Sequence, residues 1–430
     1  MKKLFCEISF FAMSCQSLIN AIFNQFNWLT LLMISSASVV AQDHYIIEGQ
    51  VVDASTNKPV PFATLSIADG LLSNETNSEG YFMLNIPKQA KFDTLRLVAL
   101  HYQLTQIPLI SLPSTKAIIR LDARPHQMHV STTDTYFSFE QPFQTRDTLL
   151  KAVAAIAKNY THKPTLLHEF YREIIQEQPT NLCVSYTEGL MDVYKPSYYF
   201  PGKDDQIHFI KGRRKPLSSF SIPVLSPGPW SSNMLDVVKY QEFLFHNGKL
   251  NKEYIFALAG RTVVGGQPVY IITFNPRSSK EATGYYKGKL FLLLGSLAII
   301  GAEYELTDQG LSLLNKSRYA QVYATQLSQR VYRVTYSQFG DQWSFQSGSV
   351  ENSFRQMASG LSFRSRIDLV VTHRQVEDAK PFLTRELADY RTMRLDSFDK
   401  TNSTYWAGET YLAPPHPLPP LLIEAEANRP

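Results

Sequence analysis

Cysteine is scarce in this sequence, with 3 residues in 430: Cys6, Cys15 and Cys183. Two of them lie near the N-terminus, in a segment with the features of a removable leader. The remaining Cys183 then has no partner for an internal disulfide, so the fold must depend on its hydrophobic core. Leu182 and Val184 flank Cys183, and this apolar setting favours a buried structural thiol over a nucleophile.

An excess of charge of either sign is also missing. The chain has 42 basic and 38 acidic residues and a net charge of +4, which gives no electrostatic argument for a nucleic-acid partner. One dense basic cluster exists, made of Lys211, Arg213, Arg214 and Lys215. We expect it to be a solvated loop. The alternative is a site for the phosphate of lipid A or of a phospholipid head group, because arginine binds phosphate bidentately.

Long apolar runs are absent after residue 41. Before it, the run Trp28–Val40 ends in small residues, with Val39 and Ala41 at the −3 and −1 positions of a cut before Gln42. We therefore predict a signal peptide at 1–41 and an exported protein of the periplasm or outer membrane. An uncleaved anchor is the alternative, although the run is shorter than the roughly 20 residues that span a bilayer.

A lipoprotein signal is a further alternative for the leader. It would use Cys15, which follows Ala12-Met13-Ser14. The charged Glu7 in the preceding apolar stretch argues against it.

Catalytic signatures are missing as well. The sequence has no G-x-S-x-G elbow, no H-E-x-x-H and no P-loop. His168 and Glu169 are adjacent, but no second histidine follows at the spacing of a zinc-protease helix. His126 and His129 could form a metal pair, yet no acidic or cysteine ligand lies near them, so we expect exposed, unpaired side chains.

Four ionisable residues could combine as acid and base: Glu169, Arg172, Glu173 and Glu188. On helices or strand edges such residues more often form surface ion pairs, and that is our prediction. We therefore predict no catalytic residue, no cofactor and no metal ligand.

Aromatic residues are abundant, with 23 Tyr and 26 Phe, and they favour strands. Short alternating segments at 45–53, 63–67, 82–86, 93–100 and 117–121 are separated by turn signals such as Asn57-Lys58-Pro59 and Asn77-Ser78-Glu79-Gly80. This spacing predicts a small antiparallel β-sandwich at 42–122. Asn77 and Glu79 could alternatively belong to a cation loop, although a simple turn suffices.

The same region resembles a known family. The resemblance is carried by Gly49-x-Val51-Val52-Asp53, Lys58-Pro59-Val60-Pro61-Phe62-Ala63-Thr64, Thr76-Asn77-x-x-Gly80-x-Phe82 and Asp93-Thr94-Leu95. It is similar to the carboxypeptidase-regulatory-like domain, a transthyretin-like β-sandwich at the front of many exported envelope proteins. That family is an accessory sandwich without the zinc site. His101 departs from the pattern, since the family usually has Gly there.

The second half has a different pattern. After a linker at 123–145, apolar residues at spacings of three and four predict helices at 147–159 and 164–176. Strands are then expected at 253–258, 269–274, 285–294, 296–306, 317–327, 330–339, 343–350 and 361–372. We predict a mainly β protein in which the sandwich precedes an α+β domain, residues 146–412, with a large antiparallel meander sheet capped by helices.

The start of this domain, Asn159–Glu173, resembles the uncharacterised region that follows the sandwich in envelope proteins of the same architecture. Its strand-rich part is similar to the half-barrels that carry lipids or lipoproteins across the periplasm, at the level of fold only. The prolines of the tail, 413–430, exclude a helix or an inner strand there.

These observations favour a non-catalytic, exported envelope protein that acts as a binding or structural module, with an envelope protein or lipid as its partner. A lipid or lipoprotein carrier that uses a half-barrel is the alternative, and a hydrolase or peptidase is a further one. The apolar sides of the predicted helices need burial, which favours a solid core over an empty cavity.

The leader prediction is directly testable. Cleavage after Ala41 should give a mature chain that starts at Gln42. Intact-mass analysis of protein recovered from the cell envelope measures this, and a retained N-terminal segment would show the prediction to be wrong.

Overall fold

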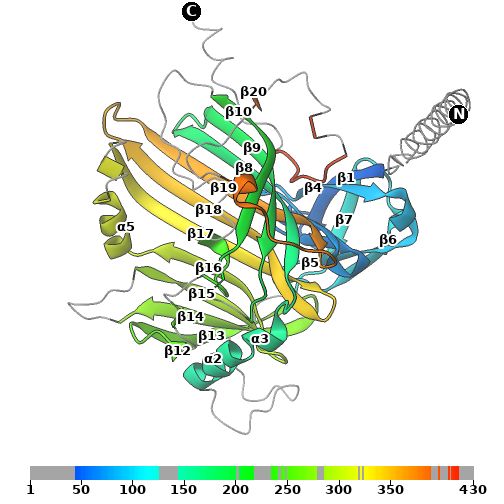
Figure 1. Cartoon of the computed structure of the whole chain (residues 1–430), viewed down its shortest axis with the longest axis horizontal. Helices are drawn as coiled ribbons and strands as arrows, with labels where there is room; N and C mark the ends of the chain where they lie inside the picture. The colour runs from blue at the N-terminus through cyan, green and yellow to red at the C-terminus, as the bar shows by residue number, and fades with distance from the viewer. Residues whose placement is uncertain are drawn as a thin grey trace, which may run out of the picture. The chain divides into compact units, whose positions relative to one another are not determined.

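The computed structural model describes residues 44–124, 144–199, 203–216, 234–240, 244–246, 249–277, 285–317, 320–321, 324–388, 396–397, 405–406 and 408–415. The predicted leader, most of the linker with His126 and His129, and the tail beyond 415 lie outside them. The described part is mainly β, as predicted, with a small sandwich followed by a large curled antiparallel sheet (Figure 1).

The sandwich forms where the sequence predicts it and buries its alternating apolar residues between two sheets. One sheet has the order β4 (Tyr81–Pro87), β1 (His44–Asp53), β7 (Ala117–Leu121). The other has the order β3 (Leu72–Glu75), β2 (Thr64–Ile67), β5 (Thr94–Val98), β6 (Thr105–Pro108). The prediction of a purely antiparallel sandwich is wrong in one place, because β1 and β7 pair in parallel.

The predicted turn Asn77-Ser78-Glu79-Gly80 adopts the conformation that its residues favour. Gly80 has φ +75°, and a Cβ there would lie 2.6 Å from the carbonyl oxygen of Val51. The Oδ1 atom of Asn77 accepts hydrogen bonds from the backbone N–H groups of Glu79 and Tyr81, at 3.0 and 2.9 Å. Asn77 therefore closes a turn on its own backbone, as predicted.

His101, at the position where the resembled family has glycine, takes the left-handed conformation with φ +75°. Its backbone N–H donates to the carbonyl of Val263, and its Nδ1 lies 2.6 Å from Thr262 Oγ1. A strained residue in the sandwich is thus held by bonds to the large sheet.

The large sheet is broader than the predicted meander. In spatial order its strands are β13 (Tyr254–Val264), β14 (Gln267–Pro276), β15 (Tyr286–Leu293), β16 (Ile299–Leu306), β17 (Thr325–Phe339), β18 (Gln342–Gln356), β19 (Ser362–Gln375), β8 (Thr165–Gln178), β9 (Cys183–Lys195) and β10 (Gln206–Pro216). The meander β13 to β19 confirms the prediction. The short β20 (Asp396–Ser397) pairs in parallel with β10.

The helix predicted at 164–176 is wrong, because these residues form the central strand β8 between β19 and β9. Its apolar residues come in adjacent pairs, which fits a helical stripe and equally fits a strand buried on both faces. Tyr171 packs into one hydrophobic cluster and Phe170 into another. The paired apolar residues fit both a helix and a strand, and burial on both faces of the sheet explains why they form a strand.

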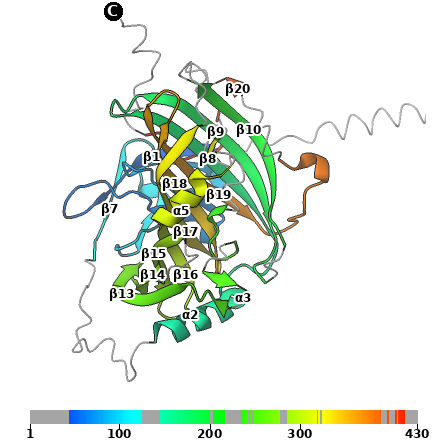
Figure 2. The same ribbon diagram turned by 90° about the vertical axis from the view of Figure 1, so that its left-hand side faces the viewer.

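The helix predicted at 147–159 is present as α2 (Thr145–Ala154) and α3 (Ile156–Asn159), which lie at one end of the large sheet (Figure 2). The strand predicted at 317–327 is wrong. A helix, α5 (Asp308–Asn315), comes first, and the strand starts only at Thr325. Thr307 caps α5, and the side chain of Asn315 bonds both backbone groups of Leu327, which ties the end of α5 to the start of β17.

Sandwich and large sheet are joined through β3, which meets β19 at the pair Leu72 and His373. Next to this pair lies Arg374, which is fully buried. Its guanidinium donates to sandwich acceptors on one side and to sheet acceptors on the other. These acceptors are the Gly70 carbonyl (3.0 Å), Ser73 Oγ (2.9 Å), Ser337 Oγ (3.0 Å), the Phe345 carbonyl (2.9 Å) and Gln346 Oε1 (2.7 Å).

We expect the substitution Arg374→Met to lower the free energy of unfolding by about 3 kcal/mol or more, because it leaves several buried acceptors without a donor. Urea unfolding measures the loss. The matched control is Arg364→Met, which removes an exposed arginine from the same strand. Equal stability of the two variants would contradict the role of Arg374 as the joint.

Candidate functional site

The large sheet has two faces of different character. We call inner face the one that contains Tyr332, Gly348, Leu369 and Tyr171, and outer face the one that carries the alternate residues of the same strands. The curl brings distant strands together on the inner face, since Val193 of β9 and Phe274 of β14 belong to one hydrophobic cluster. The inner face is therefore the enclosed, apolar side of the sheet.

The described residues between 234 and 250, which are 234–240, 244–246 and 249–250, cover part of the inner face, and we call them the cover. The apolar side chains that the structure describes in this stretch are all buried, apart from Met234: Leu235, Val237, Val238, Leu244 and Leu250. Leu235 lies against Gly348 of β18, where a Cβ would come within 2.6 Å of Leu235 Cδ1. In the described residues of this cover, the two-residue strands β11 (Phe245–His246) and β12 (Lys249–Leu250) pair with each other, and the Val238 N–H donates to the Tyr336 hydroxyl of the large sheet at 3.1 Å.

Four buried charges fix the start of this cover. Lys195 of β9 forms ion pairs with Asp205 and, at 2.9 Å, with Asp236, and Lys239 pairs with Asp205 at 2.6 Å. These four side chains are at most 1 % exposed. The hydroxyl groups of Tyr198 and Tyr336 donate to Asp236 at 2.6 and 2.7 Å.

The cluster has two lysines and two aspartates, but burial and the nearby charge of Lys195 lower the pKa of Lys239, which Asp205 offsets only in part. Burial opposes the charge on Lys195, but Asp205 and Asp236 outweigh it and hold the pKa of Lys195 well above its ordinary value. Burial likewise opposes the charge on Asp236, yet Lys195 and the two tyrosine hydroxyls lower its pKa. The cluster binds the cover to the sheet through ion pairs and tyrosine hydrogen bonds.

Glu173 differs from this cluster. It lies on the inner face of β8, is 2 % exposed, and its Oε2 accepts a hydrogen bond of 3.4 Å from Tyr171. Its Oε1 accepts none from the residues that the structure describes. Burial raises the pKa of Glu173 to about 7, and the charge of Arg214 only partly offsets this. An acidic group at the edge of protonation thus lies buried on the inner face, beside Thr187 of β9.

The outer face holds two of the other acids and bases that the sequence singled out, Arg172 and Glu188, whereas Glu169 is fully buried on the inner face, on the same side of β8 as Tyr171 and Glu173. Arg172 and Glu188 are both at most 2 % exposed and pair at 2.8 Å, and Arg213 adds a second pair to Glu188 at 2.9 Å. We predicted ion pairs on the surface. Arg172 and Glu188 do form an ion pair, but it is buried in the interior. Sequence reasoning missed this because it placed Arg172 on a helix.

The basic cluster is not the loop that we predicted. Lys211, Arg213 and Arg214 lie on strand β10, and Lys211 pairs with Glu409 of the tail at 3.3 Å. Alternate residues of a strand point to opposite faces, so the cluster is divided between the two sides of the sheet. This division separates Arg214 from Lys211 and Arg213, and Arg213 is already paired with Glu188.

The remaining candidates have structural roles where the structure describes them. Cys183 is buried, and burial raises the pKa of its thiol to about 12, which fits the predicted inert thiol. No group of three or more potential metal ligands occurs within the described residues. No helix among them is long and apolar enough to span a membrane.

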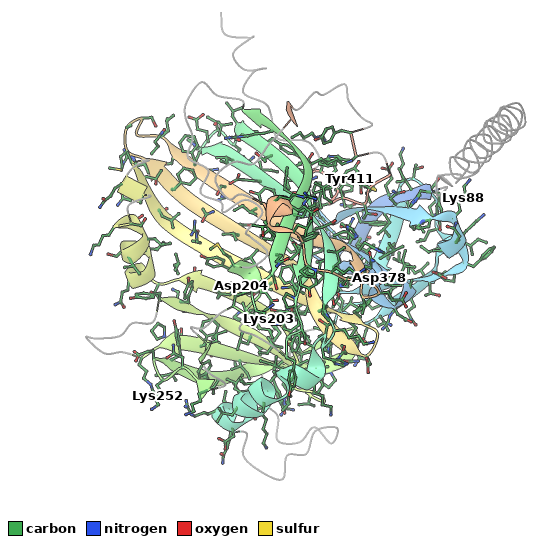
Figure 3. All side chains as sticks on the ribbon, viewed as in Figure 1. Lys88, Lys203, Asp204, Lys252, Asp378 and Tyr411 are labelled. Carbon is green, nitrogen blue, oxygen red and sulfur yellow. The ribbon has the colours of Figure 1, made fainter. Side chains whose placement is uncertain are left out.

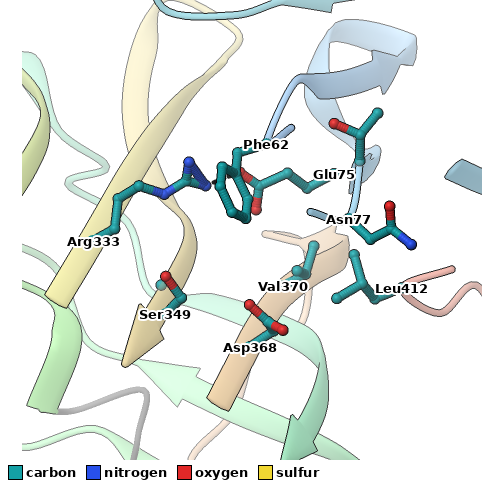
Figure 4. Close-up of a pocket in the computed structure, with 10 residues that line it drawn as sticks. Phe62, Glu75, Asn77, Arg333, Ser349, Asp368, Val370 and Leu412 are labelled. Carbon is teal, nitrogen blue, oxygen red and sulfur yellow. Dashed lines mark hydrogen bonds and ion pairs between the residues drawn. The ribbon is translucent and has the colours of Figure 1, made fainter. Parts of the chain in front are cut away.

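The joint between sandwich and sheet contains a small cavity of about 10 Å³, the size of a single water (Figure 4). Glu75 pairs with Arg333 there at 2.9 Å, and the guanidinium carbons of Arg333 and Arg366 lie 3.2 and 4.9 Å from the centre of the Phe62 ring. Burial raises the pKa of Glu75. The cavity is too small for a ligand, so this part of the molecule is a joint.

Two larger spaces are open to solvent. One, of about 90 Å³, lies between the sandwich and the β13–β14 hairpin and includes Arg96 and Gly265. The other, of about 490 Å³, is lined by residues near the start of β8 and by the β17–β18 turn, among them His162 and Asp341. Neither brings together a set of side chains with a recognisable chemistry.

The raised pKa of Glu173 makes stability depend on pH. The folded state holds this proton more tightly than the unfolded chain, so the free energy of unfolding falls as pH rises from about 4.5 to 7, by up to about 3 kcal/mol. Glu173→Gln should remove this loss and be more stable than the parent at pH 8. Urea unfolding at pH 5 and pH 8 measures it, with Glu177→Gln near the end of the same strand as control. If the free energy of unfolding of the Glu173 variant falls with pH as steeply as that of the parent, Glu173 is not the group responsible for the pH dependence.

Comparison with known proteins adds little. No family model matches the chain, and no curated relative does. Among solved structures, a DUF1329 family protein from Desulfovibrio piger covers 57% of this chain and 100% of its own at 13% identity and a TM-score of 0.28. A putative outer membrane lipoprotein-sorting protein domain from Vibrio parahaemolyticus covers 55% and 95% at 11% identity and a TM-score of 0.27. A LolA superfamily protein from Nitrosomonas europaea covers 58% and 100% at 12% identity and a TM-score of 0.24. At such scores the similarity supports no inference about function.

Proposed function

We propose that this chain is a non-catalytic binding protein that holds an acyl chain or a similarly apolar ligand on the inner face of its curled sheet. The observation that supports this most directly is the cover at 234–250, which packs its leucines and valines on that face without extending the sheet. A ligand that displaces these side chains would bury an equal apolar area, so the exchange costs little hydrophobic free energy.

The magnitudes are sufficient for such an exchange. Each buried methylene contributes about 0.8 kcal/mol, so an acyl chain of a dozen carbons can replace several leucine and valine side chains. Micromolar affinity requires about 8 kcal/mol net of the cost of association. The glycine at 348 helps, because Leu235 rests there on backbone and can leave without disturbing a neighbouring side chain.

The chemistry of the buried acids and bases supports binding over catalysis. Glu188 is fixed by two arginines, and Asp205 and Asp236 are fixed by lysines and tyrosines. Groups held in pairs of this kind stabilise a structure and do not transfer protons. The site of action remains the exported envelope compartment of our prediction, and the sandwich remains a proposed accessory domain of the carboxypeptidase-regulatory-like type.

The test compares two leucine-to-alanine variants. Leu235→Ala loosens the cover, so we expect a fluorescent fatty acid to bind at least about tenfold more tightly than to the parent. Leu95→Ala removes an equally buried leucine from the sandwich core and should leave the affinity unchanged. Native mass spectrometry of protein purified from its own envelope should show a bound lipid.

Two results would contradict the proposal. One is a clean apo mass together with no fatty-acid uptake by the parent or either variant, which would leave the solid core of a scaffold protein. The other is equal uptake by the Leu235 and Leu95 variants, since binding would then follow general destabilisation.

A further inference from the structure

The outer face carries a second, independent feature. A C-terminal segment, residues 405–406 and 408–415, lies across it where the sandwich meets β8, and Tyr411 marks the place in Figure 3. This segment contains neither a helix nor a strand in its described residues. Both the sandwich and the large sheet contribute side chains that contact it.

Three side chains bind consecutive backbone carbonyl groups of the segment. Asn74 of the sandwich donates to the carbonyl of Tyr411 at 3.0 Å. Arg172 of the sheet donates to the carbonyls of Leu412 and Ala413 at 2.7 and 2.8 Å.

The fourth carbonyl in the row is bound by Asn77, which donates to Pro414 at 2.9 Å and more weakly to Ala413 at 3.3 Å. Carbonyl groups are common to every residue type. These bonds therefore recognise an extended backbone rather than a particular sequence.

Two apolar anchors add side-chain selectivity. Trp406 and Leu412 pack with Phe170, Leu190 and Val370 of the outer face in one cluster. The ring centres of Trp406 and Phe170 are 5.6 Å apart in an edge-to-face arrangement. The indole Nε1 of Trp406 also donates to Glu188 Oε2 at 3.0 Å.

Arginine stacking strengthens the tryptophan site. The guanidinium carbon of Arg213 lies 5.2 Å from the Trp406 ring centre, and Lys211 Nζ lies 5.5 Å from it. A tryptophan in a buried pocket with a satisfied N–H is typical of the residues that dominate binding energies at peptide interfaces.

We propose that this surface is a peptide-binding groove, and that residues 405–415 are its replaceable intramolecular ligand. Its ligand class is an extended peptide with a tryptophan anchor and, six residues later, a leucine followed by alanine and proline. In the intact chain the chain's own tail fills the groove and connects the sandwich to the large sheet. The groove lies on the face opposite to the proposed acyl site, so the two sites can be tested separately.

The arrangement differs from that of a core segment. Core strands gain their bonds from a ladder in which both backbone groups take part, whereas here side chains of the groove supply the donors. Without the segment, Arg172 keeps its pair with Glu188 and the two asparagines can bind water. The groove can therefore exist empty at moderate cost.

The experiment uses the full chain with a site for a sequence-specific protease placed within 398–403. The folded protein is cut there and mixed with a labelled synthetic peptide of residues 404–415, and fluorescence anisotropy follows its binding. We expect the cut protein to remain folded and the peptide to exchange with the tail in a saturable manner. A peptide with Trp406→Ala should bind at least about tenfold more weakly.

A matched variant of the protein separates recognition from charge. Arg172→Lys keeps the charge but loses the fork that reaches two carbonyls, and should weaken peptide binding, whereas the exposed Arg364→Lys should not. Arg172→Lys can also affect folding. The Trp406→Ala peptide leaves the protein unchanged, so it tests recognition of the peptide independently of folding. Failure to exchange, unfolding after the cut, or equal binding of the Trp406→Ala peptide would each overturn the proposal.

Discussion

Burial of both faces of the central strands β19 and β8 is the constraint on which the rest of the structure depends. A strand covered on both sides cannot leave a charged residue without a partner, because an isolated buried charge costs several kcal/mol. Arg172 and Arg374, one on each strand, are both fully buried and both heavily hydrogen-bonded. Their hydrogen-bond partners lie outside the two strands. The bonds of these two arginines therefore connect the sandwich and the C-terminal segment to the large sheet.

The covers on the two sides are attached by different forces. Inside, residues 234–250 bury leucines and valines and are fixed at one end by an ion cluster with balanced charge. Outside, the sandwich and the tail bind through hydrogen bonds to side chains and through the stacking of aromatic rings on arginine. A sheet with one apolar and one polar face thus acquires one apolar and one polar cover.

Local features of the fold could be predicted from the sequence. Asn77 and Gly80 determine a turn by their own chemistry, and the meander from β13 to β19 follows from alternation and the Gly265-Gly266 turn. Strand β8 could not be predicted, since its paired apolar residues fit a helix until β9 and β19 are placed on either side. Polar and apolar residues come in pairs from Leu166 to Ile175, so the segment itself carries no alternation that indicates a strand.

The site was harder to predict than the fold because its partners are distant in the sequence. Glu75 and Arg333 are separated by 258 residues, and Arg172 and Ala413 by 241. No local pattern connects such pairs. A tryptophan in a proline-rich tail, Trp406, was the one local sign that the segment needs a binding surface, and its indole N–H finds Glu188.

The difference between the two covers determines what can release each of them. The ions of the inner cluster are at most 1 % exposed, so salt hardly screens the attraction between them. The apolar contacts around these ions weaken only when other apolar groups replace them. We therefore expect the inner cover to respond to the proposed apolar ligand and to be insensitive to ionic strength. The outer segment is held by hydrogen-bond donors that another peptide backbone can also satisfy. In our proposals a single strand, β8, therefore separates two binding surfaces with chemically distinct partners.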